Sequence, residues 1–582
     1  MAWYDEAVFY HIYPLGLTGA PMENSYGEVE HRLNTLIPWI AHIKEIGCNA
    51  LYIGPLFESV GHGYETTDYK KLDSRLGDNK DLTNFVAECH KQGIKVILDG
   101  VFNHTGRDFF AFKDIQKNRE NSQYKDWYCN VNFSGNTEYN DVFSYENWGG
   151  YNLLVKLNQQ NPAVRDYICD VIRFWVSEYD IDGIRLDAAD VLDFNYMKAL
   201  RQVANEVKPD FWLMGEVIHG DYSKWVNEGT LHSVTNYQLH KALYSGHNDH
   251  NYFEIAHTVK RLYEMGGNKP DGLKLYNFTD NHDVERIYTK LNNKAHFAPV
   301  HILEYTLPGV PSIYYGSEFG IEGRKEQFSD ASLRPALNLE DYKDAVTNNS
   351  FTRLLAALGK TRQNCKALSY GDYKELILMN RQYAFSRNYN GESVVVAVNN
   401  DDSDYTMTLP VGNAAEYIGA LSGEKVSVNN GNIVVTIKAN YGEIWMPVTN
   451  GNDKAKDISP VELNVADAVA DITPDSTSAN ETKDTAAEAV AAPQDTTANA
   501  SSDNSAEEKQ ETSAVSPAAE TNANNSVFDA EQLAFEKGKI AGLQEAILAI
   551  MEKNGPVTDQ MRKDVEANVY HDSLINWVKS FR

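Results

Sequence analysis

Two acidic residues, Asp187 and Glu216, each follow a short apolar run, in GIRLDAAD and FWLMGEVIHG. Hydrolysis of a glycosidic bond with retention of configuration needs two carboxyl groups about 5 Å apart, one ionised and one protonated. The two groups must therefore lie in unlike surroundings, because their pKa values have to differ. We take Asp187 as the candidate nucleophile and Glu216 as the candidate acid/base.

Arg185 lies two residues before Asp187, so on a strand both side chains point to the same face. A guanidinium there would favour the ionised carboxyl that a nucleophile requires. Glu216 ends an apolar strand beside Gly215, and an apolar approach raises a carboxyl pKa toward the value that a general acid needs. Either residue alone would more often be part of a structural ion pair than a catalyst, and it is the combination that favours catalysis.

The elements that must position these residues recur through the first part of the chain. The eight apolar runs that end in polar residues are VFYHIYPLG, ALYIGPLF, KVILDGVFNH, DGIRLDAAD, FWLMGEVIHG, SVTNYQ, LKLYNFTDNHD and PSIYYGSEFG. Helical patterns such as AVRDYICDVIRFWVSEY lie between most of them. This alternation predicts an α/β fold, a (β/α)8 TIM barrel over residues 1–360, with a doubly wound open sheet as the alternative. In such a barrel the reacting groups lie at the C-terminal ends of the strands.

The remaining segments predict four further units. Residues 106–152 lack the alternation and read as an insertion after the third strand that walls one side of a cleft. Residues 361–447 change to a period of two and predict an antiparallel β-sandwich domain. The composition of 448–526 predicts a disordered acidic linker. Apolar residues at helical spacing in 527–582 predict a helical module that could contact a partner protein or a second copy.

Composition and charge exclude several classes of partner. A formal net charge of -29 would repel phosphate backbones, so we expect no nucleic-acid partner. No apolar stretch approaches the length of a membrane span, and the N-terminus has no signal-peptide pattern, which together predict a soluble, cytoplasmic protein. The 5 cysteines form no disulfide or zinc pattern. The many aromatic residues suit a site for a neutral ligand such as a sugar.

Four of these segments resemble, in order and spacing, the short regions that identify the alpha-amylase family: DGVFNHT, GIRLDAAD, GEVIH and FTDNHD. The resemblance covers Met1 to about Pro447 and implies the same barrel. It also implies that Asp187 is the nucleophile, Glu216 the acid/base, and Asp283 a third carboxylate that grips sugar hydroxyls and helps to distort the ring. The roles inferred from the residues themselves agree.

The resemblance implies further site residues around one sugar. His104 and His282 match histidines that donate hydrogen bonds to it, and Tyr64 matches an aromatic ring that stacks on it. Asp330 and Arg334, four apart in FSDASLRPA, resemble a pair that holds the next sugar, with a surface ion pair as the alternative. Arg185 completes the set of substrate-binding candidates.

Asn103 matches a calcium ligand of many relatives. The other ligands cannot be placed in the short insertion, so Ca²⁺ remains a candidate and the metal-binding residues stay unassigned. No organic cofactor is required for the expected chemistry.

Two departures bear on the substrate. Ala188, Ala189 and Asp190 follow Asp187 where starch-degrading amylases have a Lys-His pair, which argues against tight binding of long polymer beyond the cleavage point. The GEVIH segment resembles the neopullulanase and cyclomaltodextrinase branch, although the N-terminal β domain of that branch is missing from the start of this sequence. The resemblance therefore implies hydrolysis of α-1,4 bonds in maltodextrins or related α-glucan oligosaccharides through a covalent intermediate. The alternatives are a transglycosylase with the same three carboxylates and a non-catalytic sugar-binding or assembly protein.

Overall fold

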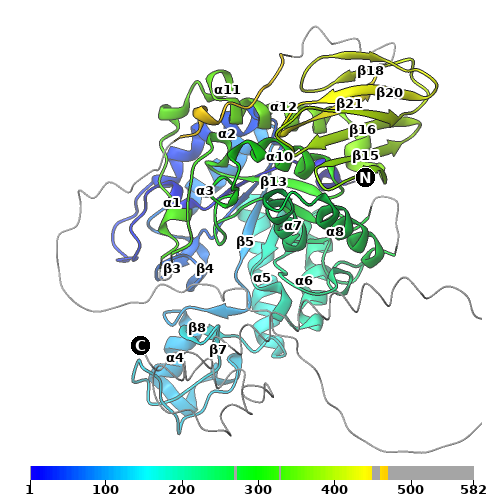
Figure 1. The fold of residues 1–582 in the computed structure, drawn as a ribbon. Helices are drawn as coiled ribbons and strands as arrows, with labels where there is room; N and C mark the ends of the chain where they lie inside the picture. Colours follow the sequence, from blue (N-terminus) through cyan, green and yellow to red (C-terminus); the bar gives the residue numbers. More distant parts are fainter. Residues whose placement is uncertain (1, 268–271, 327–328, 449–458, 470–582) are drawn as a thin grey trace, which may run out of the picture. The chain divides into compact units, whose positions relative to one another are not determined.

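The computed structural model describes residues 2–267, 272–326, 329–448 and 459–469. Eight parallel strands form one sheet in the order β11-β10-β9-β5-β2-β1-β13-β12. These strands are β1 (Phe9–Ile12), β2 (Ala50–Ile53), β5 (Lys95–Gly100), β9 (Gly183–Leu186), β10 (Trp212–Gly215), β11 (Ser233–Val234), β12 (Tyr276–Phe278) and β13 (Val310–Tyr314). A parallel bridge from Thr235, just after β11, to Tyr276 joins the two edges of the sheet. The predicted eight-stranded barrel is therefore confirmed, and Figure 1 labels two of its strands, β5 and β13.

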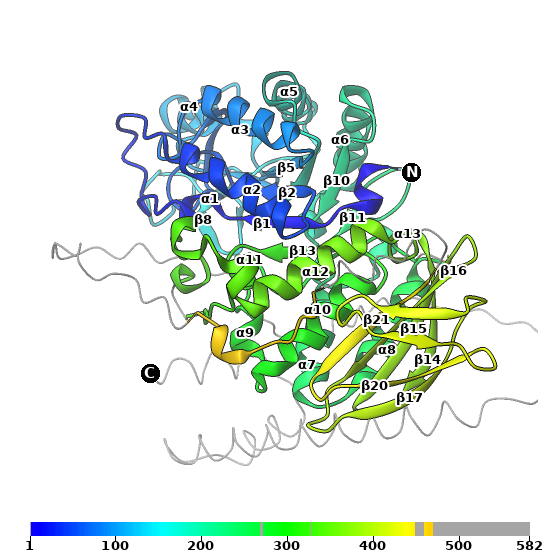
Figure 2. The ribbon, with the colours of Figure 1, turned by 90° about the horizontal axis from the view of Figure 1, so that it is seen from above.

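Helices follow most of the barrel strands and cover their outer side, as Figure 2 shows for α2, α3, α5 and α6. The helices of the barrel and its loops are α1 (Pro14–Leu17), α2 (Ile37–Glu45), α3 (Asn79–Lys91), α5 (Pro162–Tyr179), α6 (Phe194–Val207), α7 (Tyr237–Asn248), α8 (Tyr252–Met265), α9 (Ile287–Lys290), α10 (Phe297–Thr306), α11 (Ala345–Asn348), α12 (Ser350–Asn364) and α13 (Lys366–Tyr370). Their ends are set by local chemistry. The Asn161 side chain caps α5, which has Pro162 at its first position and is followed by Asp180 in a left-handed backbone conformation with a φ of 57°. None of the described helices is both long and apolar enough to cross a membrane.

The inside of the barrel is packed with rings at its N-terminal end. Phe9 and Trp212 stack with their centroids 5.1 Å apart, and Tyr52, Met214 and Tyr276 belong to the same buried cluster. Because side chains alternate along a strand, the next inward positions carry the polar residues of the site at the C-terminal end. The apolar layer thus forms a rigid floor below the charged groups.

The expected insertion is present between β5 and α5. It contains β6 (His104–Thr105), α4 (Phe110–Asn118), β7 (Asn147–Trp148) and β8 (Tyr151–Lys156), and its three strands pair in the order β6-β8-β7. A second small sheet pairs β3 (Phe57–Ser59) with β4 (Thr66–Leu72). A cavity of about 740 Å³ lies between the insertion, at Tyr128 and Asn130, and the loop after the candidate nucleophile, at Asp190. The insertion therefore borders open space next to the site.

The antiparallel domain that follows is also confirmed. Its strands are β14 (Asp372–Leu378), β15 (Gln382–Tyr389), β16 (Glu392–Asn399), β17 (Tyr405–Pro410), β18 (Glu416–Gly419), β19 (Lys425–Ser427), β20 (Asn432–Ile437) and β21 (Tyr441–Pro447). Six of them form one sheet, and β17 pairs with β20 in a second. Arg387 of β15 is buried and donates a 2.5 Å hydrogen bond to the carbonyl of Thr306, which fastens this domain to α10 of the barrel.

Residues 459–469 differ from the predicted disordered linker. This segment, which we call the strap, hydrogen-bonds to the β domain from Val461 N to Leu421 O at 3.0 Å and to the barrel from Val469 N to Phe319 O at 3.1 Å. Buried Val461 anchors it against the core. Leu463, Ala468 and Val469 also pack against the core, but the segment is short and most of the predicted linker is polar, which is why composition alone missed it. Residues 449–458 and 470–526 of the predicted linker lie outside the described residues. The predicted helical module over 527–582 lies outside them as well.

We expect a chain that ends at Pro447 to be less stable than one that ends at Val469. The shorter chain loses the strap's hydrogen bonds, each contributing about 1 kcal/mol net, and part of that loss is offset by regained chain entropy. The expected fall in unfolding free energy is about 1–3 kcal/mol, measured by urea denaturation of both chains. Equal stability of the two chains would show that the strap contributes nothing to the fold.

Candidate active site

Arg185 on β9 brings the two catalytic candidates together. Its Nη1 lies 2.8 Å from Asp187 Oδ1 and its Nη2 lies 2.8 Å from Glu216 Oε2. The same Nη1 donates to Asp99 Oδ1 at 2.9 Å, and Asp99 on β5 is in register with Arg185. Asp187 and Glu216 therefore both contact the Arg185 guanidinium, and they lie at the C-terminal ends of β9 and β10.

Three carboxyl groups share this single guanidinium. Burial raises the pKa of Asp187 well above its usual range; Arg185 opposes the shift, and the negative charges of Glu216 and Asp99 add to it. We predicted that Arg185 would keep Asp187 ionised, but the same guanidinium also neutralises two other carboxylates. The raised pKa of Asp187 is therefore contrary to the prediction that Arg185 keeps this carboxyl ionised.

The surroundings of Glu216 also differ from the prediction. Its Oε2 accepts a hydrogen bond from the backbone N–H of Ala188 at 3.1 Å in addition to the contact with Arg185, and the Tyr237 hydroxyl donates to its Oε1 at 3.4 Å. Ala188 has a left-handed backbone with a φ of 46°, which is uncommon for a residue with a side chain and aims its N–H at Glu216. The apolar run before Glu216 packs below the site, so the carboxyl itself meets polar donors.

The third carboxylate, Asp283, lies in a separate set of charges. His282 Nε2 is 3.0 Å from Asp283 Oδ2, and Arg334 Nη2 donates to Asp283 Oδ1 at 2.9 Å and to Asp330 Oδ2 at 3.0 Å. Burial alone would raise the pKa of Asp283, but His282 and Arg334 hold it well below its usual range. Asp283 is thus ionised. The pair of Asp330 and Arg334 belongs to the site and is not the surface ion pair considered as the alternative.

Tyr64 connects the charged groups around Arg185 with those around Asp283. Its hydroxyl donates to Asp99 Oδ2 at 3.0 Å and also contacts His282 Nε2, and its ring stacks on His282 with centroids 5.7 Å apart. Tyr64 and His282 are both buried. The predicted residues Tyr64, His282, Asp283 and Arg185 therefore form one contiguous wall.

His104 at the start of β6 is buried, and burial lowers its pKa to about 3. Its Nδ1 lies 3.2 Å from Asn103 Nδ2. Its Nε2 is buried without a hydrogen-bond partner in the described chain. An imidazole with one unused nitrogen suits the predicted role of donating to a sugar hydroxyl.

Several residues of the site were not predicted from the sequence, among them Tyr237, His11, Tyr13 and Lys325. Tyr237 follows β11 and contacts Glu216, so the rule that strand ends carry the site would have found it. Buried His11 lies on β1, so the same rule would have found it. Its ring stacks on that of Tyr52 with centroids 4.1 Å apart. Tyr13 stacks on His282 at 5.7 Å, and Lys325 donates to the carbonyl of Asp283 at 2.9 Å. These two come from loops, where no spacing rule indicates which side chains meet.

The surroundings of Asn103 do not fit a calcium ion. Its Oδ1, the atom that would bind a cation, already accepts a 3.0 Å hydrogen bond from Gln159 Nε2. Its Nδ2 faces His104, so each end of the amide already has a hydrogen-bond partner in the described chain. Calcium prefers several oxygen ligands with carboxylates among them, and the groups bonded to the Asn103 side chain here are an amide and an imidazole.

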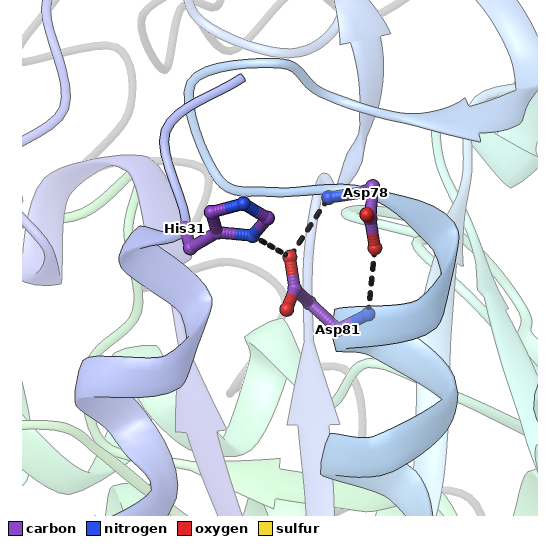
Figure 3. Close-up of side chains that lie close together, drawn as sticks. All are labelled: His31, Asp78 and Asp81. Atoms are coloured by element: carbon purple, nitrogen blue, oxygen red, sulfur yellow. Dashed lines mark hydrogen bonds and ion pairs between the residues drawn. The ribbon is translucent and has the colours of Figure 1, made fainter.

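One group of side chains in the described residues has metal-ligand spacing, and it lies elsewhere. His31, Asp78 and Asp81 have ligand atoms within 4.8 Å of one another (Figure 3). Asp78 and Asp81 cap the N-terminus of α3 reciprocally, and His31 Nδ1 lies 2.5 Å from Asp81 Oδ2. The contacts of this group are those of a helix cap, which accounts for the residues without a metal.

Comparison with known proteins places this geometry in a family. Residues 22–369 match the alpha-amylase catalytic domain and residues 371–445 match the alpha-amylase C-terminal domain. The chain is 31% identical to a cyclomaltodextrinase of Thermoanaerobacter pseudethanolicus, over 70% of this chain and 72% of that protein. It is 30% identical to neopullulanase 2 of Thermoactinomyces vulgaris, over 76% of this chain and 78% of that protein.

A solved structure supports the same family assignment. An alpha-amylase of Anoxybacillus superposes with a TM-score of 0.65 at 25% identity, covering 77% of this chain and all (100%) of that one. The match spans more than half of the sequence and includes every segment that carries the candidate catalytic residues. The chain belongs to the alpha-amylase family of glycoside hydrolases.

Proposed function

We propose that this protein hydrolyses α-1,4 bonds of maltodextrins or related α-glucan oligosaccharides with retention of configuration. The observation that carries the proposal is the placement of Asp187 and Glu216 on one guanidinium, with ionised Asp283 on the connected wall. The relatives named cyclomaltodextrinase and neopullulanase support an α-glucan as substrate.

The proposed reaction has two steps. In the first, the Asp187 carboxylate attacks the anomeric carbon while Glu216 gives its proton to the leaving oxygen. In the second, Glu216 takes a proton from water, and the resulting hydroxide displaces Asp187 from the sugar. Asp283 binds the hydroxyl groups of the sugar and stays charged throughout.

A parallel digest tests the proposal. Maltoheptaose, pullulan and a cyclodextrin are incubated separately with the enzyme, and the anomer formed first is followed by NMR. We expect cleavage of maltoheptaose with the α-anomer appearing first. First formation of the β-anomer would exclude retention, and longer oligosaccharides at high substrate concentration would identify a transglycosylase. No cleavage of any of the three would leave only a binding role.

We also propose that catalysis needs no calcium. The Asn103 amide is committed to Gln159 and His104, so chelation should remove nothing from the site. We expect dialysis against EDTA to leave kcat unchanged, and added Ca²⁺ to shift Tm by less than about 1 °C, because a ligand stabilises only a fold that binds it. A larger rise in Tm with Ca²⁺, or loss of activity in EDTA that Ca²⁺ restores, would overturn this.

A further inference from the structure

A chain of hydrogen bonds runs from the start of α6 to His104. The backbone N–H of Asp193 donates to Gln159 Oε1 at 2.6 Å, and Gln159 Nε2 donates to Asn103 Oδ1 at 3.0 Å. Asn103 Nδ2 then lies 3.2 Å from His104 Nδ1. Gln159, Asn103 and His104 are all buried, so water does not compete for these bonds.

The first donor fixes the direction of the whole chain. A backbone N–H can only donate, so the atom of Gln159 that faces Asp193 must be its oxygen. The other end of that amide is then its NH₂ group, which requires the oxygen of Asn103 opposite to it. The NH₂ group of Asn103 is left facing His104. These orientations are usually ambiguous for amides, but here the backbone determines them.

The direction of the chain also determines the tautomer of His104. A ring nitrogen that accepts from an NH₂ group carries no proton, so Nδ1 is the unprotonated nitrogen. The single proton of the neutral ring must then be on Nε2. Nε2 is the buried atom that has no partner in the described chain.

We propose that Gln159 is a positioning residue that holds the proton of His104 on Nε2, ready to be donated to a sugar hydroxyl. Gln159 acts through the directed hydrogen bond from its Nε2 to Asn103 Oδ1. Donation from His104 to a sugar hydroxyl depends on the proposed function, whereas the tautomer of His104 does not.

The test reads the tautomer directly in the substrate-free protein. Protein with ¹⁵N-labelled histidine rings gives ¹⁵N–¹H correlations whose pattern distinguishes the two neutral tautomers, and His104→Gln assigns the signal by its loss. We expect the Nε2–H tautomer in the parent. Gln159→Met removes both hydrogen bonds at similar length and should give a mixture of tautomers. Gln160→Met changes the exposed neighbour in the same loop and should leave the signal as in the parent.

A second variant covers the case that Gln159→Met does not fold. Asn103→Asp offers His104 only an acceptor, so it should place a proton on Nδ1. A parent with its proton on Nδ1, or a single Nε2–H tautomer retained in Gln159→Met or in Asn103→Asp, would overturn the proposal.

Kinetics separate a positioning role from a merely structural one. We expect Gln159→Met to lower kcat/KM for maltoheptaose about tenfold, the scale of one lost hydrogen bond to the substrate. In the His104→Gln background the same change should cost nothing further, because Gln159 acts through His104. Fully additive losses would show another route and overturn the proposal. If the parent cleaves no α-glucan, the proposed function fails, while the NMR experiment still decides the role of Gln159.

Discussion

Asp187→Asn is expected to lower kcat on maltoheptaose by roughly 10⁴-fold or more, the scale of loss when a nucleophile is removed. The amide keeps the size of the side chain but cannot form the glycosyl ester. The fold should persist, and Tm should stay the same or rise, because the amide replaces a carboxyl whose charged form is disfavoured by burial and by Glu216 and Asp99. Turnover within about tenfold of the parent would exclude Asp187 as the nucleophile.

A small anion distinguishes loss of the nucleophile from general damage. In Asp187→Ala, azide can occupy the vacated space and attack a maltosyl fluoride, whose leaving group needs no acid. We expect a β-glycosyl azide, because a single displacement inverts the configuration. Formation of the α-glycosyl azide in this variant would mean that the covalent intermediate still forms on another residue.

Glu216→Gln is expected to lower kcat/KM on maltoheptaose by roughly 10³-fold, within the range that general acid catalysis contributes. An aryl glycoside with an acidic leaving group needs no proton, so its glycosylation step should fall by less than about tenfold. Pre-steady-state release of the aryl alcohol measures that step. Equal losses on both substrates in this step would show that Glu216 is not the acid.

The matched azide experiment gives the opposite stereochemistry at this position. In Glu216→Ala the nucleophile is intact, so azide intercepts the covalent intermediate and two inversions yield the α-glycosyl azide. The pair of alanine variants therefore assigns both roles by product configuration alone. The β-product from Glu216→Ala would require exchanging the roles of Asp187 and Glu216.

This exchange of roles is worth testing because, without substrate, the surroundings of Asp187 and Glu216 do not identify which carboxyl is the nucleophile and which is the acid. Burial raises the pKa of Asp187, and Glu216 receives hydrogen bonds from Arg185 and Ala188 that suit a charged group. The arriving sugar is what must make the two surroundings unlike. Its glycosidic oxygen offers Glu216 a partner for a proton, and its anomeric carbon offers ionised Asp187 an atom to attack.

The sequence by itself determined the barrel and placed the candidate catalytic residues at the ends of its strands. Each strand appears as a short apolar run, and inward residues two apart on a strand share a face, so GIRLDAAD already placed Arg185 beside Asp187. The position of Glu216 after β10 follows from the same rule. These features are local, because they depend on residues within one run and on the side-chain alternation of a strand.

Only the tertiary structure decided what those residues contact. That Arg185 also binds Asp99 and Glu216 depends on the register of three strands that are far apart in sequence. That Gln159 reaches Asn103 depends on how the end of the insertion meets β5, and the strap's attachment depends on a surface built from two domains. A guanidinium and an amide satisfy whichever groups the fold brings near, so their partners cannot be read from spacing along the chain.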